Sequence, residues 1–116
     1  IGYRKGPLMA SSDKFEITVK GKQTHGSRPW AGVDPIVTSA QNINSAQTII
    51  SRQTDITKAP AVLSFGIVEG GVRNNIIPDD VTLIGTIRNF DMDIRSDIHN
   101  RLTHTAETIA EANGGE

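Results

Sequence analysis

Three polar side chains in this sequence could bind or polarise a substrate, and the first of them is His25. It lies in the Gly- and Pro-rich stretch GKQTHGSRPWAGVDPI, residues 21–36. An imidazole can donate a hydrogen bond to a developing oxyanion or to a carboxylate, and the neighbouring glycines would let a ligand approach closely. A loop histidine that bonds only to a backbone carbonyl could have the same sequence, so this stretch alone leaves a structural and a functional role open.

Asn75 and Arg88 are the other two candidates. Asn75 lies in GGVRNNIIP and precedes Ile76 and Ile77, which predicts a held amide able to bind a carboxylate or a carbonyl. An Asn in such a loop can equally serve only as a turn residue. Arg88 offers a guanidinium fork for a carboxylate, whereas its structural alternative is a solvated cross-strand pair worth under ~1 kcal/mol.

The composition excludes several other kinds of site. The 116 residues include no Cys and only 3 His, which excludes disulfides and thiolate zinc sites and leaves too few ligands for a His-rich zinc site. The sequence has no phosphate-binding glycine loop, no G-x-S-x-G elbow and no H-E-x-x-H motif. A net charge of −1 gives no electrostatic argument for nucleic acid, and no apolar run approaches the ~20 residues of a membrane span.

Alternating and helical patterns predict the elements that position these residues. KFEITVKG, residues 14–21, alternates as a half-buried strand, and Asp34 followed by Pro35 predicts a helix that runs to about Arg52. The apolar stripe of this helix is expected to contain Ile36, Ala40, Ile43 and Ile50, with Ile49 outside it.

Two further strands and a second helix follow. The strands are expected over residues 59–71 and 79–90, with Arg88 on the face away from the helices, and the second helix begins at Asp91 or Asp93. The expected buried faces consist of Leu63, Phe65 and Ile67 on the first strand, Val81, Leu83 and Ile87 on the second, and Ile94, Ile98, Leu102, Ile109 and Ala112 on the helix.

This order of elements predicts the fold class. Strand, helix, strand, strand, helix favours an α+β protein, a ferredoxin-like β-α-β-β-α(-β) two-layer sandwich with two helices on one face of an antiparallel sheet. That motif has one more strand, which is expected after Gly115 and is missing from this sequence. One edge of the sheet should therefore be open.

Taken together, the quoted stretches resemble a known family. GKQTHGSRPWAGVDPI, GGVRNNIIPDD and GTIRNFD, in this order, are similar to the dimerisation (lid) domain of the zinc-dependent aminoacylase, carboxypeptidase and amidohydrolase metallopeptidases, and GPLMASSDKF is similar to the lead-in of that domain. The branch that the sequence most resembles is the bacterial N-acyl-amino-acid amidohydrolases. The resemblance implies that residues 1–12 are a linker from the catalytic domain and that residues 13–116 are the dimerisation domain, truncated before its final strand.

The resemblance also implies an activity and a role for each candidate residue. The parent enzyme would hydrolyse the amide bond of N-acyl amino acids or small peptides with two zinc or other divalent metal ions, all bound by a catalytic domain absent from this chain. The chain would form a homodimer, in which His25 reaches the partner's active site and polarises the scissile carbonyl or stabilises the oxyanion. Asn75 and Arg88 would hold the terminal carboxylate of the substrate. The fragment alone is expected to be inactive.

Further expectations concern the dimer, the compartment and the alternatives. We expect the homodimer to form through the edge of the strand at residues 61–69 with the first helix alongside, and we expect a cytoplasmic protein, although a periplasmic or secreted one is compatible with the sequence. The first alternative is a ferredoxin-like regulatory domain that senses an amino acid through Asn75 and Arg88. The second is an RNA-binding sheet. Such sheets use exposed aromatic residues and a basic stripe, and this sequence lacks both.

Overall fold

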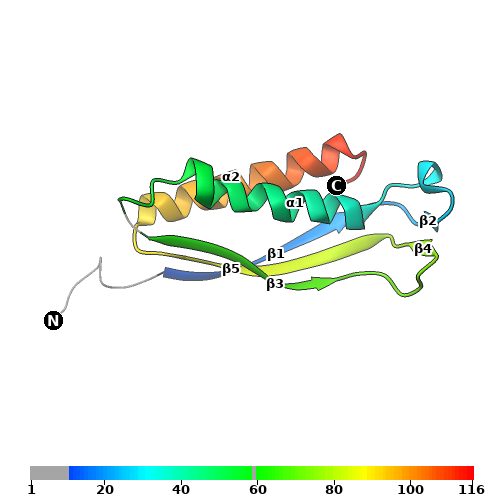
Figure 1. Ribbon diagram of the computed structural model, residues 1–116, viewed down its shortest axis with the longest axis horizontal. Helices are drawn as coiled ribbons and strands as arrows, with labels where there is room; N and C mark the ends of the chain where they lie inside the picture. Colours follow the sequence, from blue (N-terminus) through cyan, green and yellow to red (C-terminus); the bar gives the residue numbers. More distant parts are fainter. Residues whose placement is uncertain (1–10, 59) are drawn as a thin grey trace.

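The protein is a two-layer α+β sandwich, as predicted. The computed structural model describes residues 11–58 and 60–116, so the predicted lead-in over residues 1–10 lies outside the described residues. Two helices cover one face of an antiparallel sheet (Figure 1). In chain order the elements are β1 (Ser11–Lys20), β2 (Thr24–His25), the 3₁₀ turn η2 (Pro29–Ala31), α1 (Pro35–Thr48), the π-helical segment η3 (Ile49–Gln53), β3 (Ala61–Glu69), β4 (Ile76–Ile77), β5 (Asp80–Asn89) and α2 (Met92–Ala112).

The main sheet has the strand order β1-β5-β3, with β5 in the centre and both pairings antiparallel. Side chains of β5 alternate between the two faces, and Val81, Leu83 and Ile87 are buried under the helices, as predicted. Arg88 lies on the other face and is exposed, which confirms its predicted orientation. Two short strands that the sequence pattern did not predict, β2 and β4, pair with each other beyond the end of the sheet where α1 begins (Figure 1).

Helix α1 begins where the sequence predicted. The Oδ1 atom of Asp34 accepts hydrogen bonds from the backbone N–H groups of Ile36 and Val37, at 2.9 and 3.2 Å, so this carboxylate caps the helix in front of Pro35. The regular helix ends at Thr48 and continues as η3 to Gln53, close to the predicted end.

The predicted buried face of α1 was wrong in part: Ile43 and Ile50 are half-buried against the core, but Ile36 and Ala40 are exposed. Ile36 is 50% exposed, whereas Ile49, which was placed outside the stripe, is fully buried. The helix packs instead through the small polar residues Thr38, Ser39 and Asn42, together with Pro35 and Ala46. These polar groups can be buried because each donates to a carbonyl of its own helix: Thr38 and Ser39 through their hydroxyls at 2.9 and 2.6 Å, and Asn42 through its amide at 3.3 Å. Such small side chains let the helix approach the sheet closely, so that Ile36 and Ala40 lie outside the contact and Ile43 and Ile50 lie at its margin.

The predicted face of β3 was wrong at one residue. Leu63 is buried and Phe65 is half-buried, as expected, but Ile67 is 43% exposed. The register against β5 shifts between Phe65 and Ile67, so Ile67 pairs with Ile84 on the face away from the helices. A β-bulge of this kind adds one residue to the strand and reverses the alternation beyond it.

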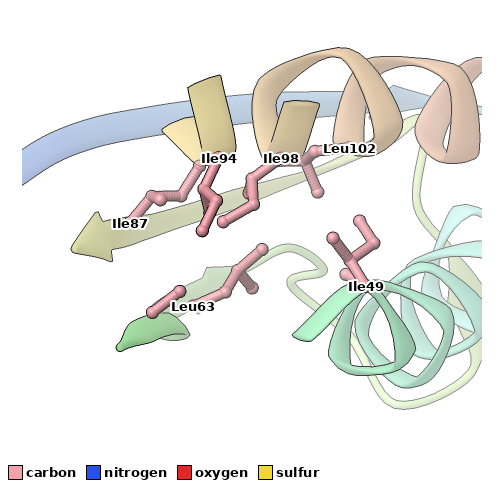
Figure 2. Packing of buried hydrophobic residues seen from close by; sticks show 8 residues of the cluster. Ile49, Leu63, Ile87, Ile94, Ile98 and Leu102 are labelled. Carbon is pink, nitrogen blue, oxygen red and sulfur yellow. The ribbon is translucent and has the colours of Figure 1, made fainter. Parts of the chain in front are cut away.

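Helix α2 contributes a stripe of isoleucine and leucine side chains to the core between the layers. The helix is capped by Asp91, which is one of the two residues predicted to begin it. Ile94, Ile98 and Leu102 are buried, as predicted. Figure 2 shows their side chains pointing into the same space as Ile49 of η3. Toward its end the buried position is Ala110, and Ala112 is exposed, contrary to prediction.

The outer edge of β1 is open over most of its length. Within residues 11–58 and 60–116, no strand pairs with this edge. At its end, however, Lys20 and Glu116 exchange two backbone hydrogen bonds, at 2.8 and 2.9 Å. This reciprocal pair is the hydrogen-bonded pairing of an antiparallel ladder.

Candidate functional site

Two of the three candidate residues, His25 and Asn75, are brought together at one end of the molecule. His25 pairs with Ile76 in the small β2–β4 sheet. Next to it, the backbone N–H of Gly26 donates to the backbone carbonyl of Asn75 at 2.7 Å. The loop that carries the imidazole and the loop that carries the amide therefore form one structural unit. The sequence pattern did not predict this contact, because two-residue strands have no period to detect.

The two loops pack closely at Gly26, where a larger residue would push them apart by a few tenths of an ångström. A Cβ atom on Gly26 would come within 3.2 Å of the carbonyl oxygen of Asn75 and within 3.3 Å of its carbonyl carbon. Gly71, in the second loop, has a φ of +87°, a backbone conformation that favours glycine. The glycines thus set both the spacing of the loops and the path of the second one.

The imidazole of His25 is exposed but held at one nitrogen. Its Nδ1 atom accepts a hydrogen bond from the backbone N–H of Ser27 at 3.1 Å and lies 2.7 Å from the Ser27 hydroxyl oxygen. Across the turn, the backbone N–H of Arg28 donates to the carbonyl of His25 at 2.9 Å. In the part of the chain that the structure describes, Nε2 of His25 has no hydrogen-bond partner, so this atom is available to a ligand.

The side chain of Asn75 is exposed, and no hydrogen bond to its amide occurs among the described residues. The expectation that the amide is held was therefore wrong for this single chain, although the backbone of Asn75 is held through Gly26. A hollow of about 350 Å³ lies between the two loops, and its lining includes Gly26, Arg73, Asn74 and Ile77. Asn75 itself does not line this hollow, although its neighbours Asn74 and Ile76 do.

Arg88 lies far from the other two candidates. It is near the end of β5, where it pairs in register with Ser12 of β1 and Val62 of β3. At a rise of about 3.3 Å per residue, the eight steps from Asp80 to Arg88 span roughly 26 Å. Since β2 and β4 lie beyond the Asp80 end of β5 (Figure 1), His25 and Arg88 of one chain are separated by more than that length. One chain cannot bring both side chains to one small substrate.

A second exposed surface lies along β3 and α1. Strand β3 is an edge strand of the described sheet, and it exposes Val62, Ile67 and Val68 at 54, 43 and 57%. Beside it, α1 exposes Ile36 and Val37, each at 50%. A hollow of about 230 Å³ runs between the two elements, lined by Ile36, Ser39, Ala40, Ile43, Val68, Gly70 and Val81. Ile36 and Val68 line this hollow, whereas Val62 and Ile67 lie on the sheet face away from the helices, so the apolar exposure reaches both faces at the β3 edge. Apolar exposure along an unpaired edge strand is typical of a surface that another chain covers.

No group of three or more His, Asp or Glu side chains within residues 11–58 and 60–116 is placed to hold a metal ion. The described residues therefore do not form a metal site, and no catalytic step through a metal can be assigned to them. The helices of the described chain are also too short or too polar for a membrane span.

Comparison with known proteins identifies the family. The sequence matches the peptidase dimerisation domain of the M20 peptidases over residues 10–114. It is 38% identical over 112 residues to an N-acetyl-L-cysteine deacetylase of Bacillus subtilis, covering 97% of this chain and 27% of the relative. It is 40% identical over 106 residues to thermostable carboxypeptidase 2 of Saccharolobus solfataricus, covering 91% of this chain and 27% of the relative.

A solved structure agrees with this match. A dinuclear metal binding peptidase of the M20 family from Bacillus subtilis superposes with a TM-score of 0.72 at 34% identity, covering 99% of this chain and 26% of that one. The chain thus spans about a quarter of the length of each of these relatives. With its two-layer fold and its matched loops, the chain belongs to the M20 peptidase dimerisation domain family.

Proposed function

We propose that this chain is the dimerisation domain of a larger metal-dependent amidohydrolase, which hydrolyses the amide bond of N-acyl amino acids or small peptides. The relatives that support this substrate class are an N-acetyl-L-cysteine deacetylase and a carboxypeptidase. In this proposal the catalytic domain binds two zinc or other divalent metal ions, which would activate the attacking water. The chain described here contributes the dimer contact and three side chains.

The observation that carries the proposal is the separation of His25 and Arg88 along the sheet. An active site that uses both residues must take them from two different chains, because the two side chains of one chain lie more than roughly 26 Å apart. We therefore propose that Arg88 serves the active site of its own polypeptide, while His25 and Asn75 serve the site of the partner.

The exposed edge of β3 offers a contact that would place the residues in this way. In a two-fold symmetric dimer with β3 paired to its own copy, the two strands run antiparallel. The Glu69 end of one β3, near β2 and β4, would then lie beside the Ala61 end of the other, near Arg88. The two β5 strands would be about three inter-strand spacings, or roughly 14 Å, apart. The apolar side chains of α1 would extend the same contact.

Each side chain then has a role that its chemistry allows. His25 would donate a hydrogen bond from Nε2 to the scissile carbonyl and, more strongly, to the oxyanion that forms from it. Arg88 would bind the terminal carboxylate of the substrate through its guanidinium fork, assisted by the Asn75 amide. None of these groups cleaves a bond by itself, so the chain alone should be inactive.

The predicted domain limits belong to the same proposal, with one change at the boundary. Residues 13–116 would form the dimerisation domain, and its sheet also includes Ser11 and Ser12, which pair with β5 as part of β1. The reciprocal hydrogen bonds of Lys20 and Glu116 are the kind that a further antiparallel strand on the open edge of β1 would make. A cytoplasmic location remains a prediction.

The proposal can be tested by mixing two inactive variants of the full-length protein. His25→Ala and Arg88→Ala chains should each form dimers with little hydrolysis of an N-acyl amino acid. After subunit exchange, a mixed dimer would contain one intact site, built from the Arg88 of the first variant and the His25 of the second. With random exchange half of the dimers are mixed, so activity should recover to about a quarter of the wild-type value.

The control is each variant exchanged with itself, which should stay inactive. No recovery in a sample whose mixed dimers are demonstrated by mass spectrometry would mean that both residues serve one site in cis, or none. Either result would overturn the proposed arrangement.

A further inference from the structure

The contacts of His25 determine which of its two ring nitrogens carries the proton. A backbone N–H can only donate, so the Ser27 N–H at 3.1 Å requires an unprotonated lone pair at Nδ1. The neutral imidazole must then carry its hydrogen on Nε2. With Nδ1 as acceptor, the hydroxyl of Ser27 at 2.7 Å also acts as a donor to the same atom. The tautomer is thus assigned from the hydrogen-bond network.

This tautomer is the one that a role in oxyanion stabilisation needs. The exposed Nε2–H can donate to a negatively charged oxygen, whereas the other tautomer would present a lone pair there and repel it. Two donors from one residue also limit rotation of the ring. The backbone around the ring is fixed independently, by the bonds from Gly26 to Asn75 and from Arg28 to His25.

We propose that Ser27 is a positioning residue, which holds the imidazole of His25 as the Nε2–H tautomer and aims this N–H at the substrate of the partner active site. This inference rests on the proposed function of His25. It assigns to Ser27 a role in catalysis through His25 and no contact with the substrate. Loss of the Ser27 hydroxyl should therefore lower kcat and leave KM nearly unchanged, since the ring acts on the reacting carbonyl and not on the remainder of the substrate.

The test is a double-mutant cycle in the full-length enzyme with an N-acyl amino acid as substrate. Ser27→Ala keeps the backbone N–H and removes the hydroxyl, and it should lower kcat about 2- to 12-fold, the range for one net hydrogen bond, with little change in KM. In the His25→Ala background the same substitution should have no effect on the residual rate, because no ring is left to position. Ser27→Thr, which retains the hydroxyl, should recover most of the loss.

A matched control comes from the same loop. The hydroxyl of Thr24 donates to the carbonyl of Arg28 at 3.1 Å and does not contact the imidazole. Thr24→Val removes that bond and keeps the shape of the side chain, so kcat should change by less than about twofold. A loss in Thr24→Val equal to that in Ser27→Ala would mean that loop order matters and the contact to the ring does not, which would overturn the inference.

A direct readout is the ¹⁵N spectrum of histidine-labelled enzyme. In its neutral form, His25 should show a protonated Nε2 and an unprotonated Nδ1. The opposite tautomer would refute the inference and leave the role of His25 standing. By contrast, full activity of His25→Ala would refute the proposed function itself, so the two failures can be told apart.

Discussion

Ile49 and Ile36 lie on different sides of the first helical segment, and replacing each with Ala tests which side faces the core. Ile49 is fully buried against Leu102 and other core residues, whereas Ile36 is 50% exposed on the surface beside β3. Truncating a buried Ile to Ala removes its transfer free energy and leaves a cavity, which together cost about 2–5 kcal/mol. At about 4 °C per kcal/mol for a chain of this size, Ile49→Ala should lower Tm by roughly 8–20 °C.

Ile36→Ala should behave differently. Half of the residue is already in water, so the lost burial is about 1 kcal/mol, and the better helix propensity of Ala offsets part of it by about 0.4 kcal/mol. The assay is urea unfolding of the 116-residue chain, followed by circular dichroism at a concentration where the chain is monomeric. Equal losses of unfolding free energy in the two variants would refute the assignment of the helix faces.

Three further predictions concern the surface, a loop and a helix cap. Val68→Lys on the exposed edge of β3 should shift the dimer to monomer in light scattering without lowering Tm, and an unchanged dimer would exclude this edge as the contact. Gly71→Ala should cost about 1–2 kcal/mol of unfolding free energy in urea titrations because φ is +87°, whereas Gly66→Ala, which also has open space, should be nearly neutral. The hydrogen bond from the backbone N–H of Ile94 lowers the pKa of Asp91 below its ordinary 3.8, and the Asp93 N–H and Lys58 add to this against the raising effect of desolvation. The contribution of the Asp91 carboxylate to stability is therefore complete above pH 3.8 and is lost as the pH falls through the lowered pKa. Asp91→Asn should flatten the dependence of Tm on pH in this acid range. An unchanged dependence would contradict the role of Asp91 as the helix cap.

The strands and the second helix could be predicted because their patterns are local. In β5, alternating side chains correctly separate the buried Leu83 and Ile87 from the exposed Arg88. In α2, the spacing of Ile94, Ile98 and Leu102 gives the buried stripe. Each pattern follows from the period of one element, so no knowledge of its partner was needed.

The face of α1 could not be predicted by the same rule. The rule counts apolar residues, and here the helix packs through Thr38, Ser39 and Asn42, which satisfy their polar groups on their own backbone. Of the apolar stripe, Ile36 remains exposed, whereas Ile43 and Ile50 are only half-buried. The bulge after Phe65 likewise has no signature in the alternation, because it depends on the register of β3 against β5.

The sequence by itself determined the fold class, the family resemblance and the identity of His25, Asn75 and Arg88 as candidates, since residue types and their local spacing are written in the chain. Only the tertiary structure decided which candidates meet. His25 and Asn75 are 50 positions apart and adjacent in space, because the hydrogen bond between Gly26 and Asn75 joins their loops. Arg88 is only 13 positions from Asn75 and yet lies at the other end of the sheet, because an extended strand carries the chain away at about 3.3 Å per residue.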